Sequence, residues 1–414
     1  MSSTNPQDRR RHLTETLEQV VASLVDGTQA AAAGAVIRLD VPGLDLSHTA
    51  VAGVATPDGA PMTPGHAVHV ASIGKLMTAT LILQLAEEGR FGEGGLDRRL
   101  GDLGLLEADL VDRLHVRDGR SRGGELTLRR LLTHTAGLGD AFGDDATGTA
   151  EALGRPAPGA LAPALWRALK ARQDGAPLSP DLASRIWAMW DPARPSDPDA
   201  GLLNRYIHQL GEAPPALPGE RFHYSDQGFV LLALIAERAS HLPYAELQRR
   251  RIFEPLGMTG SWMHMREAPP AVMAGLECDV WLNGVPMLAH GANLSFDFGG
   301  GGQVMTVADM ATFLDALLAG RLFTQPQTLA AMTDWITPAG LTPPRVAIGL
   351  GLHQWAAAPG GPAFIGHAGA WGAHLWRDPR TGATVAGTVN QRDLGAWAFD
   401  LLEEVHSLHQ DTGG

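Results

Sequence analysis

A serine and a lysine three residues apart are the first candidates for chemistry in this chain. They are Ser72 and Lys75, in the sequence Ser-Ile-Gly-Lys. On a helix this spacing places both side chains on one face, so the amine can hold or accept the proton of the serine hydroxyl. The pattern also occurs by chance, and a serine that only caps a helix would look the same. From the spacing alone, Ser72 is either a nucleophile or a helix cap.

The scarcity of lysine favours the nucleophile. Of the 32 Lys and Arg residues only two, Lys75 and Lys170, are lysines. An arginine cannot be deprotonated in a protein, whereas burial can bring the pKa of a lysine close to neutrality. We therefore expect Lys75 to be an amine that titrates beside Ser72.

The second candidate is a tyrosine, a residue type that occurs three times in the chain. Tyr224 precedes Ser225 and Asp226 in a predicted turn before an apolar helix. A nearby lysine cation would stabilise its phenolate, which could then act as a general base. A turn tyrosine without a catalytic role is the alternative.

The third candidate is a histidine followed by small residues. The segment His367-Ala368-Gly369 lies on an apparent edge strand and is followed by Ala370. Small residues there allow a substrate to lie along the strand as an additional one. The backbone N–H of Ala370 and that of Ser72, at the start of its helix, would then form an oxyanion hole. A structural histidine on a strand is the alternative.

A helix over about residues 72–88 must position Ser72 and Lys75. Its apolar residues lie on almost every side, as in a buried helix, and Gly89 follows as a stop signal. Periodicity and turn residues predict the other elements. The predicted helices span about 13–25, 125–133, 228–239 and 394–409, and the predicted strands about 32–39, 49–55, 299–305, 347–355, 372–376 and 383–389.

Strands at both ends of the chain with helices between them predict an α/β sandwich whose sheet is completed by the C-terminal part. We expect residues 1–88 and 290–414 to form this α/β domain, and residues 89–289 to form a helical subdomain. The segment 139–217, rich in Ala, Pro, Trp and Asp, is predicted to be an insertion or lid. Candidate apolar walls of a pocket are Trp166, Trp187, Trp190 and Trp371, with helix-core packing as the alternative for at least two of the first three.

The composition excludes several classes of function. A net charge of -13 argues against nucleic-acid binding, and the single cysteine, Cys278, rules out an intrachain disulfide. No apolar stretch approaches the roughly 18 residues of a membrane-spanning helix, and the polar first 20 residues lack the apolar core of a secretory signal. We therefore expect a cytoplasmic protein without a membrane role.

No sequence motif indicates a cofactor or metal. The run Gly299–Gly302 is not followed by the Lys of a phosphate-binding loop and more plausibly marks a close backbone approach beside the site. The sixteen histidines include no His-Glu-x-x-His and no Cys/His cluster, and there is no Gly-x-Ser-x-Gly elbow. We expect no metal, no cofactor and no α/β-hydrolase fold.

Taken in order and with their flanks, the three candidate elements resemble those of the serine β-lactamase and penicillin-binding-protein-like superfamily. The resemblance is to its branch of class C β-lactamases, D-aminopeptidases and family VIII carboxylesterases. Leu126–Leu138, Ile252–Met258 and Gly299–Gly302 with Thr306–Met310 are similar to further stretches of that branch. The resemblance covers about residues 34–390 except 139–217. It implies a β-lactamase-like fold, in which helices flank an antiparallel sheet.

The resemblance also implies roles for the candidates. Ser72 would be the acylated nucleophile, Lys75 its proton partner, and Tyr224 the base and then the acid for the leaving group. Asp226 stands where many members have Asn, and because an ionised carboxylate only accepts hydrogen bonds, we expect it to anchor Lys75 or a cationic part of the substrate. His367 stands where β-lactamases commonly have Lys, which weakens recognition of a substrate carboxylate, although some D-peptidase members also have His.

We therefore expect a serine hydrolase that cleaves a small ester or lactone through an acyl-Ser72 intermediate. An amidase or D-aminopeptidase-like peptidase is the first alternative. An acyltransferase or peptide cyclase, a weak β-lactamase, and a non-catalytic binding protein on the same fold are the others. The sequence leaves open the natural substrate, the acyl acceptor and whether the chain forms homo-oligomers.

Overall fold

The computed structural model describes most of the chain. The described residues are 5–25, 32–140, 171, 173–176, 214–282, 284–292, 294–342, 345–356, 358, 360–391 and 397–410. Most of the predicted insertion at 139–217 lies outside them, as do Trp166, Trp187 and Trp190. No helix in the described part of the chain is long and apolar enough to cross a membrane.

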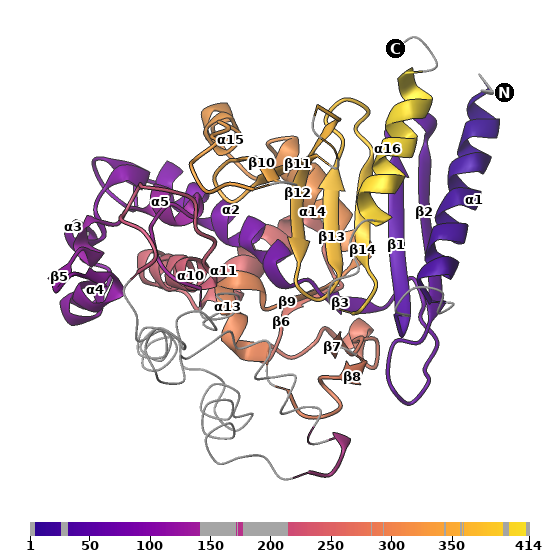
Figure 1. Cartoon of the computed structure of the whole chain (residues 1–414), viewed down its shortest axis with the longest axis horizontal. Helices are drawn as coiled ribbons and strands as arrows, with labels where there is room; N and C mark the ends of the chain where they lie inside the picture. Colours follow the sequence, from indigo (N-terminus) through magenta and orange to yellow (C-terminus); the bar gives the residue numbers. More distant parts are fainter. Residues whose placement is uncertain are drawn as a thin grey trace.

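A seven-stranded antiparallel sheet joins the two ends of the chain. Its strand order is β10-β11-β12-β13-β14-β1-β2, and β1 pairs with β14 in a register that sets Val36 opposite Thr388. Figure 1 shows the N-terminal strands beside the C-terminal ones, so the predicted completion of the sheet by the C-terminal part is confirmed. The strands are β1 (Gly34–Val41), β2 (Leu46–Gly53), β10 (Arg345–Ile348), β11 (His353–Ala356), β12 (Ala363–Gly369), β13 (Ala373–Arg377) and β14 (Thr384–Thr388).

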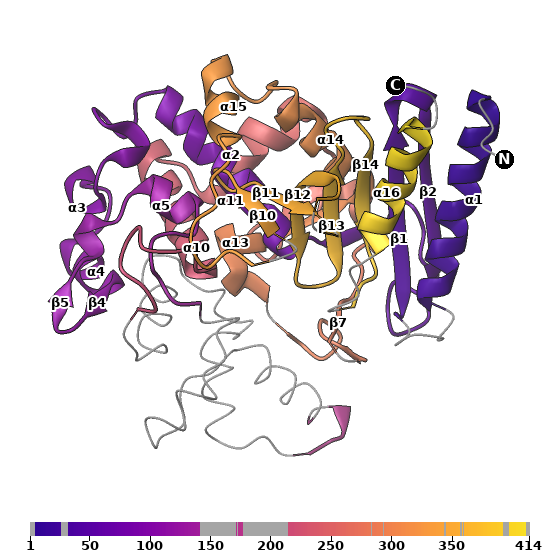
Figure 2. The same cartoon turned by 45° about the horizontal axis from the view of Figure 1, so that its top comes forward.

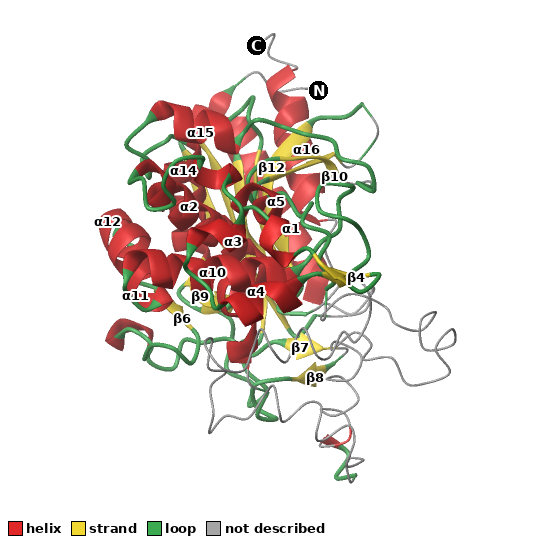
Figure 3. Cartoon of the chain, turned by 90° about the vertical axis from the view of Figure 1, so that its left-hand side faces the viewer, coloured by secondary structure: helices red, strands yellow, loops and turns green. Residues whose placement is uncertain are grey.

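Both faces of this sheet are buried, because alternate residues of a strand point to opposite sides. Ile37 and Leu39 of β1 pack with α1 (Pro6–Val25) and α16 (Trp397–Gln410), which lie side by side in Figure 1. Val36 belongs instead to the larger core, which includes α14 (Val307–Leu318). The sheet is therefore the middle layer between a helix pair and a helical body, which Figure 3 shows in front of the strands.

Helix α2 (Gly74–Glu87) is the centre of the helical body. It is buried along almost its whole length and packs against α10 (Asp226–Ser240) and α13 (Phe298–Gly301). Because its apolar residues lie on every side, a buried position is the stable one, as the sequence predicts. Its first residues follow a short 3-10 turn, Ala71–Ile73, so Ser72 lies in that turn and Lys75 in the helix proper. Figure 2 shows α2 running behind β10 and β11.

Three predicted elements have different boundaries in the structure. The predicted strand at 299–305 begins as the helix α13 and becomes β9 (Gln303–Thr306) only after Gly302. The predicted strand at 347–355 is two strands, β10 and β11, separated by a turn in which Gly351 has a φ of 82°. The predicted helix at 125–133 shortens to α5 (Leu128–Leu132), because Thr127 caps its start with a side-chain hydrogen bond.

The strand that carries His367 is internal, so its prediction as an edge strand is wrong. Strand β12 pairs with β13 on one side and with β11 on the other. The sequence could not reveal β11 as a neighbour, because it looked like the end of one long strand. The register with β11 ends at the pair His353 and Gly366, so His367 to Gly369 extend beyond it toward the turn that holds Ser72.

A smaller three-stranded sheet, in the order β3-β9-β6, lies below the large one in Figure 1. Its strands are β3 (Ala67–His69), β9 and β6 (Ser261–Met263). Strand β3 leads directly into the turn of Ser72. The remaining elements are α3 (Leu100–Leu103), α4 (Ala108–Leu114), α11 (Tyr244–Gln248), α12 (Glu254–Leu256), α15 (Pro326–Met332), β4 (Val116–Arg117), β5 (Arg120–Ser121), β7 (Trp281–Leu282) and β8 (Val285–Pro286).

The glycine run 299–302 allows its backbone to pack directly against the backbone of the turn that contains Ala71 and Ser72. A larger residue in the run should therefore destabilise the fold. A Cβ on Gly301 would lie 2.1 Å from the carbonyl carbon of Ala71, and Gly301 has a φ of 158°. We expect Gly301→Ala to lower the free energy of unfolding by about 1–3 kcal/mol, because the backbone beside Ser72 must move. Gly43→Ala is the control, since a Cβ there meets nothing within 4 Å. Equal urea midpoints for the two variants would contradict this account of the glycine run.

Candidate active site

Ser72 lies in the tight turn between β3 and α2. The residue before it, Ala71, has a φ of 46°, a left-handed conformation that costs a non-glycine residue energy. Ser72 itself is half-buried. The end of β12 lies against this turn, because a Cβ on Gly369 would come within 2.2 Å of the carbonyl oxygen of Val70. The fold therefore brings the Ser72 turn and the His367–Gly369 segment together.

Lys75 is fully buried and surrounded by oxygen atoms. Its Nζ lies 3.0 Å from the Oγ of Ser72 and 2.7 Å from the carbonyl oxygen of Gly300, and it forms an ion pair with the carboxylate of Asp226. Burial by itself lowers the pKa of Lys75, but the charges of Asp226, Tyr224 and Asp297 together with the hydrogen bond to Asp226 outweigh it, and the pKa is raised. Lys75 is thus a stable ammonium, which differs from the amine titrating near neutrality that the sequence predicts.

Tyr224 faces this ammonium from the turn before α10. The Nζ of Lys75 lies 5.0 Å from the centre of the tyrosine ring, and the guanidinium carbon of Arg345 lies 5.3 Å from it. Burial raises the pKa of Tyr224 to about 12, although the charge of Lys75 and hydrogen bonds with Lys75 and Ser72 act in the opposite direction. The expected stabilised phenolate is therefore not the resting form, because burial, supported by the charge of Asp226, outweighs the effect of Lys75 on the pKa of Tyr224.

His134 holds the turn of Tyr224 in place. Its ring stacks on the tyrosine ring with centroids 4.3 Å apart, and its Nδ1 accepts a hydrogen bond of 3.1 Å from the backbone N–H of Ser225. Its carbonyl oxygen accepts a second backbone bond, from His223. In the sequence, His134 lies within the stretch Leu126–Leu138 that resembles the superfamily, and it was given no role in the site.

His367 belongs to a group of uncharged imidazoles beside Tyr224. Its ring centre lies 4.3 Å from that of His353 and 6.3 Å from that of Tyr224, and its Nδ1 is 2.7 Å from the carbonyl oxygen of Ala368. Burial, followed by the positive charges and imidazoles nearby, holds the pKa values of His134, His353 and His367 well below the usual range. Position 367 therefore supplies no fixed positive charge to a substrate carboxylate.

The ring nitrogens of these imidazoles are only partly hydrogen-bonded. The Nε2 atoms of His134 and His367 and both ring nitrogens of His353 have no hydrogen-bond partner within the described ranges. Sequence reasoning missed His353, because its strand could not be resolved from the preceding one. A neutral imidazole donates one hydrogen bond and accepts another, so these nitrogens can form further hydrogen bonds without adding charge to the site.

A second carboxyl group, Asp297, lies near the ion pair. Burial and then the negative charge of Asp226 raise the pKa of Asp297 to about 7, although Lys75 acts in the opposite direction. Its Oδ1 would lie 2.6 Å from a Cβ on Gly300, the residue whose carbonyl binds Lys75. Sequence reasoning missed Asp297, and its position just before the glycine run was the one signal for it.

The other predicted site residues lie as follows. Asp226 is bound to Lys75, one of the two partners expected for it. Trp371 is buried in the hydrophobic core that also contains Ala373 and Leu375. Ala370 directly follows β12, and its role in an oxyanion hole stays a prediction.

The geometry defines the class of protein. A half-buried serine with a buried lysine partner and a tyrosine on an α/β sandwich is the arrangement of a serine enzyme that forms an acyl intermediate. The beta-lactamase family matches residues 17–404, and the chain belongs to this family. The predicted resemblance to the β-lactamase and penicillin-binding-protein-like superfamily and the predicted fold are therefore confirmed.

Similar proteins and structures agree with the family. The chain is 27% identical over 270 residues to penicillin-binding protein 4* of Bacillus subtilis, a match covering 64% of this chain and 44% of that protein. The chain thus spans less than half the length of this curated relative. The D-amino acid amidase of Ochrobactrum anthropi has a TM-score of 0.67 and 22% identity, with 98% of this chain and 100% of the amidase covered. A D-stereospecific amidohydrolase from Streptomyces has a TM-score of 0.64 and 24% identity over 96% and 98% of the two chains. At these identities the two structures are evidence for the fold.

The ion pair of Lys75 and Asp226 can be tested by stability without any substrate. We expect Lys75→Met and Asp226→Leu each to lower the free energy of unfolding by about 3–5 kcal/mol, because each leaves one buried charge without its partner. The double variant removes both charges and should lose less than the sum of the single variants. Urea unfolding of the four proteins measures this coupling. Strictly additive losses would show that the two side chains do not stabilise each other.

Proposed function

We propose that the protein hydrolyses a small amide through an acyl-Ser72 intermediate, as an amidase or D-aminopeptidase-like enzyme. The observation that carries the proposal is the geometry of the site, in which the Nζ of Lys75 lies 3.0 Å from the Oγ of Ser72 and 5.0 Å from the centre of the Tyr224 ring, with the pKa of both Lys75 and Tyr224 raised. An amide is cleaved only if its leaving nitrogen is protonated, so an acid that still holds its proton at neutral pH suits this substrate class.

The proton states give Tyr224 the role of a relay. As the Oγ of Ser72 attacks the carbonyl carbon, Tyr224 accepts the serine proton and passes its own proton to the leaving nitrogen. The C–N bond then breaks, the amine departs, and the acyl group remains on Ser72. In the second half, water attacks the ester carbon and gives its proton back to Ser72 through Tyr224. No free phenolate is needed in either half.

Lys75 has an electrostatic role in this scheme. Its ammonium lies 3.0 Å from the Oγ of Ser72, where negative charge develops as the proton leaves. Because Asp226 and Gly300 hold the ammonium from the other side, it is preorganised and does not reorient during the reaction. Lys75 therefore lowers the barrier without gaining or losing a proton.

The neighbouring structures support a substrate that carries an amine. Two of them are a D-amino acid amidase and a D-stereospecific amidohydrolase, and both are covered almost completely by this chain. The uncharged His367 and His353 offer nitrogen atoms that can accept hydrogen bonds from such an amine. The amide of a D-amino acid is accordingly the first substrate to test.

An ester or lactone is the second candidate, and the neutral imidazole at position 367 favours it over a β-lactam. An ester needs less assistance to its leaving group, so the same site would cleave it as well. The substrate panel below separates the two classes.

Trapping the acyl intermediate tests the nucleophile. We expect a fluorophosphonate to add one adduct to the intact chain, located on Ser72, and we expect Ser72→Ala to show none. Ser23→Ala, which changes an exposed serine of α1, should label like the unchanged protein. Intact mass and peptide mapping measure the label. If the adduct persists in Ser72→Ala, another residue is the nucleophile; a chain that is never labelled indicates a non-catalytic member of the family.

Turnover of matched substrates tests the amide. We expect D-amino acid p-nitroanilides to give a higher kcat/KM than their L-enantiomers and than a chromogenic cephalosporin. p-Nitrophenyl butyrate reports the ester activity, after subtraction of the Ser72→Ala background. Faster turnover of the butyrate than of every anilide would reverse the order of the two candidates.

The pH profile tests the relay. Because burial raises the pKa of Tyr224 to about 12, the phenol stays protonated well into the alkaline range. We expect kcat/KM for an uncharged anilide to be nearly level between about pH 8 and 10, and Tyr224→Phe to lower it by about 10²- to 10⁴-fold. A tenfold rise per pH unit would instead identify the rare phenolate as the base.

A further inference from the structure

Three potential metal ligands lie together outside the catalytic centre. His69 ends β3, His264 directly follows β6, and Glu277 forms a bridge with Ala67 beside β3. Their ligand atoms all lie within 4.8 Å of one another. None of the contacts described for Ser72, Lys75 and Tyr224 involves them, so the proposed hydrolysis does not account for their arrangement.

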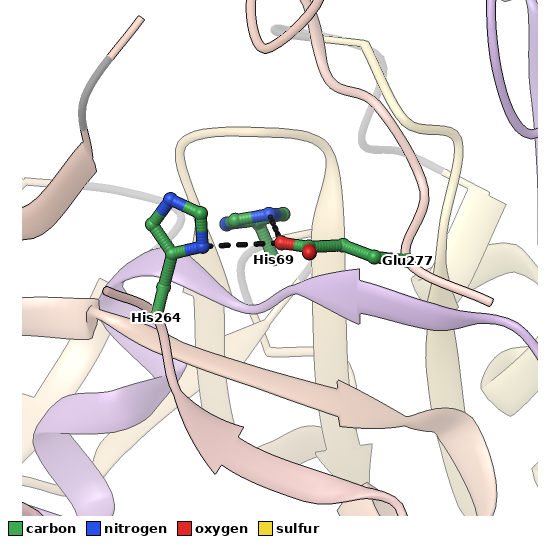
Figure 4. Close-up of side chains that lie close together, drawn as sticks. All are labelled: His69, His264 and Glu277. Carbon is green, nitrogen blue, oxygen red and sulfur yellow. Dashed lines mark hydrogen bonds and ion pairs between the residues drawn. The ribbon is translucent and has the colours of Figure 1, made fainter. Parts of the chain in front are cut away.

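The three side chains converge on one point, as Figure 4 shows. The Nε2 of His69 lies 2.8 Å from Oε1 of Glu277, and the Nδ1 of His264 lies 3.1 Å from the same oxygen. The two imidazole rings meet edge to face, with centroids 4.7 Å apart. Two nitrogen atoms and one carboxylate oxygen thus face a common position from three segments of the chain.

These distances are close to those of a zinc site. With bonds of about 2.0–2.2 Å, the ligand atoms of a tetrahedral zinc ion lie roughly 3.3–3.5 Å apart. The observed nitrogen–oxygen distances of 2.8 and 3.1 Å would need to grow by roughly 0.2–0.7 Å to reach this separation. Each imidazole would also move its proton to its other ring nitrogen, so that the lone pair points at the ion.

The position is also accessible to an ion from one side. The side chain of His69 is 3% exposed, that of His264 13% and that of Glu277 27%. Glu277 therefore forms the open side, where a water molecule can complete the coordination. Asp279, nearby in the chain, is not needed as a ligand, because both its oxygens accept backbone hydrogen bonds from residues 280, 288 and 289.

We propose that His69, His264 and Glu277 bind a divalent transition-metal ion of the zinc type. Two imidazoles and one carboxylate suit Zn²⁺ or Co²⁺, whereas Ca²⁺ and Mg²⁺ prefer sites built from oxygen atoms alone. The ion would connect β3, the end of β6 and the segment that precedes β7. Because β3 leads into the Ser72 turn, the bound ion would stabilise the strand that precedes this turn.

Metal binding to the full chain tests this proposal without any measurement of hydrolysis. After treatment with a chelator and dialysis, the protein is titrated with Zn²⁺ by calorimetry and with Co²⁺ by visible absorption. We expect one tight site per chain, a visible Co²⁺ spectrum of a site with fewer than six ligands, and a Tm that rises with Zn²⁺. Mg²⁺ and Ca²⁺ should produce none of these changes.

Two ligand variants and one control assign the site. Loss of a residue that only holds a metal ligand in place weakens metal binding by roughly 10- to 100-fold. His264 and Glu277 are proposed to bind the ion directly, so we expect His264→Ala and Glu277→Gln each to weaken Zn²⁺ binding by more than this. His48→Ala removes a surface histidine that also contacts a carboxylate, Glu18, and should bind Zn²⁺ like the unchanged protein.

Zn²⁺ binding by the unchanged protein and by Glu277→Gln decides whether the metal site exists. The amide of Glu277→Gln has the size of the carboxylate, so this variant changes the ligand and not the packing. Far-UV circular dichroism shows whether each variant is folded. Absence of a one-to-one Zn²⁺ site in the unchanged protein, or unchanged affinity in the folded Glu277→Gln, would overturn the proposal. In either case the adduct on Ser72 remains a separate test of the hydrolase.

Discussion

The buried ion pair of Lys75 and Asp226 is the interaction on which the rest of the site depends. It joins α2 to the first residue of α10, and the carbonyl of Gly300 brings α13 to the same ammonium. A buried lysine without such partners would lose its proton or unfold the site, because burial of a lone charge costs many kcal/mol. The position of Asp226 at the start of α10 also favours its negative charge. One cation thus fixes the relative positions of the helices that surround Ser72.

The same ion pair decides how the protons are arranged. Since Asp226 neutralises Lys75, little positive charge is left to stabilise a phenolate on Tyr224, and burial then keeps the phenol protonated. The pKa values of His134 and His367 are lowered first by burial and then by the positive charge of Lys75, so these imidazoles are neutral. The site therefore holds one fixed cation and several neutral donors and acceptors. This combination suits the proposed relay, in which Tyr224 accepts one proton as it donates another. No side chain then has to change its charge during the reaction.

The sequence allowed the local features of the fold and site to be predicted. Ser72 and Lys75 followed from their spacing on a buried helix, and β1 and β14 from β-branched and apolar runs at the two ends of the chain. The charge of Lys75 was not predicted: the resemblance left Asp226 either as the anchor of Lys75 or as a partner of the substrate, and only the folded chain, which brings together residues 151 positions apart, shows the ion pair. The split between β10 and β11 was also hidden, since a turn built on Gly351 interrupts an otherwise continuous apolar run. Because β11 was not recognised as a separate strand, we could predict neither the position of His353 beside His367 nor the internal position of β12.

The residues His69 to Ser72 connect the cluster of His69, His264 and Glu277 to the nucleophile turn. His69 contacts Glu277, Val70 donates its N–H to the carbonyl of Gln303, and Ala71 takes the left-handed conformation beside Gly301. Each contact fixes the backbone one residue closer to the nucleophile. A turn under backbone strain keeps its shape only if the flanking chain is held firmly. The cluster around Glu277 holds the N-terminal side of this turn, and the ammonium of Lys75 holds the other, so the position of the Ser72 hydroxyl is determined from both directions.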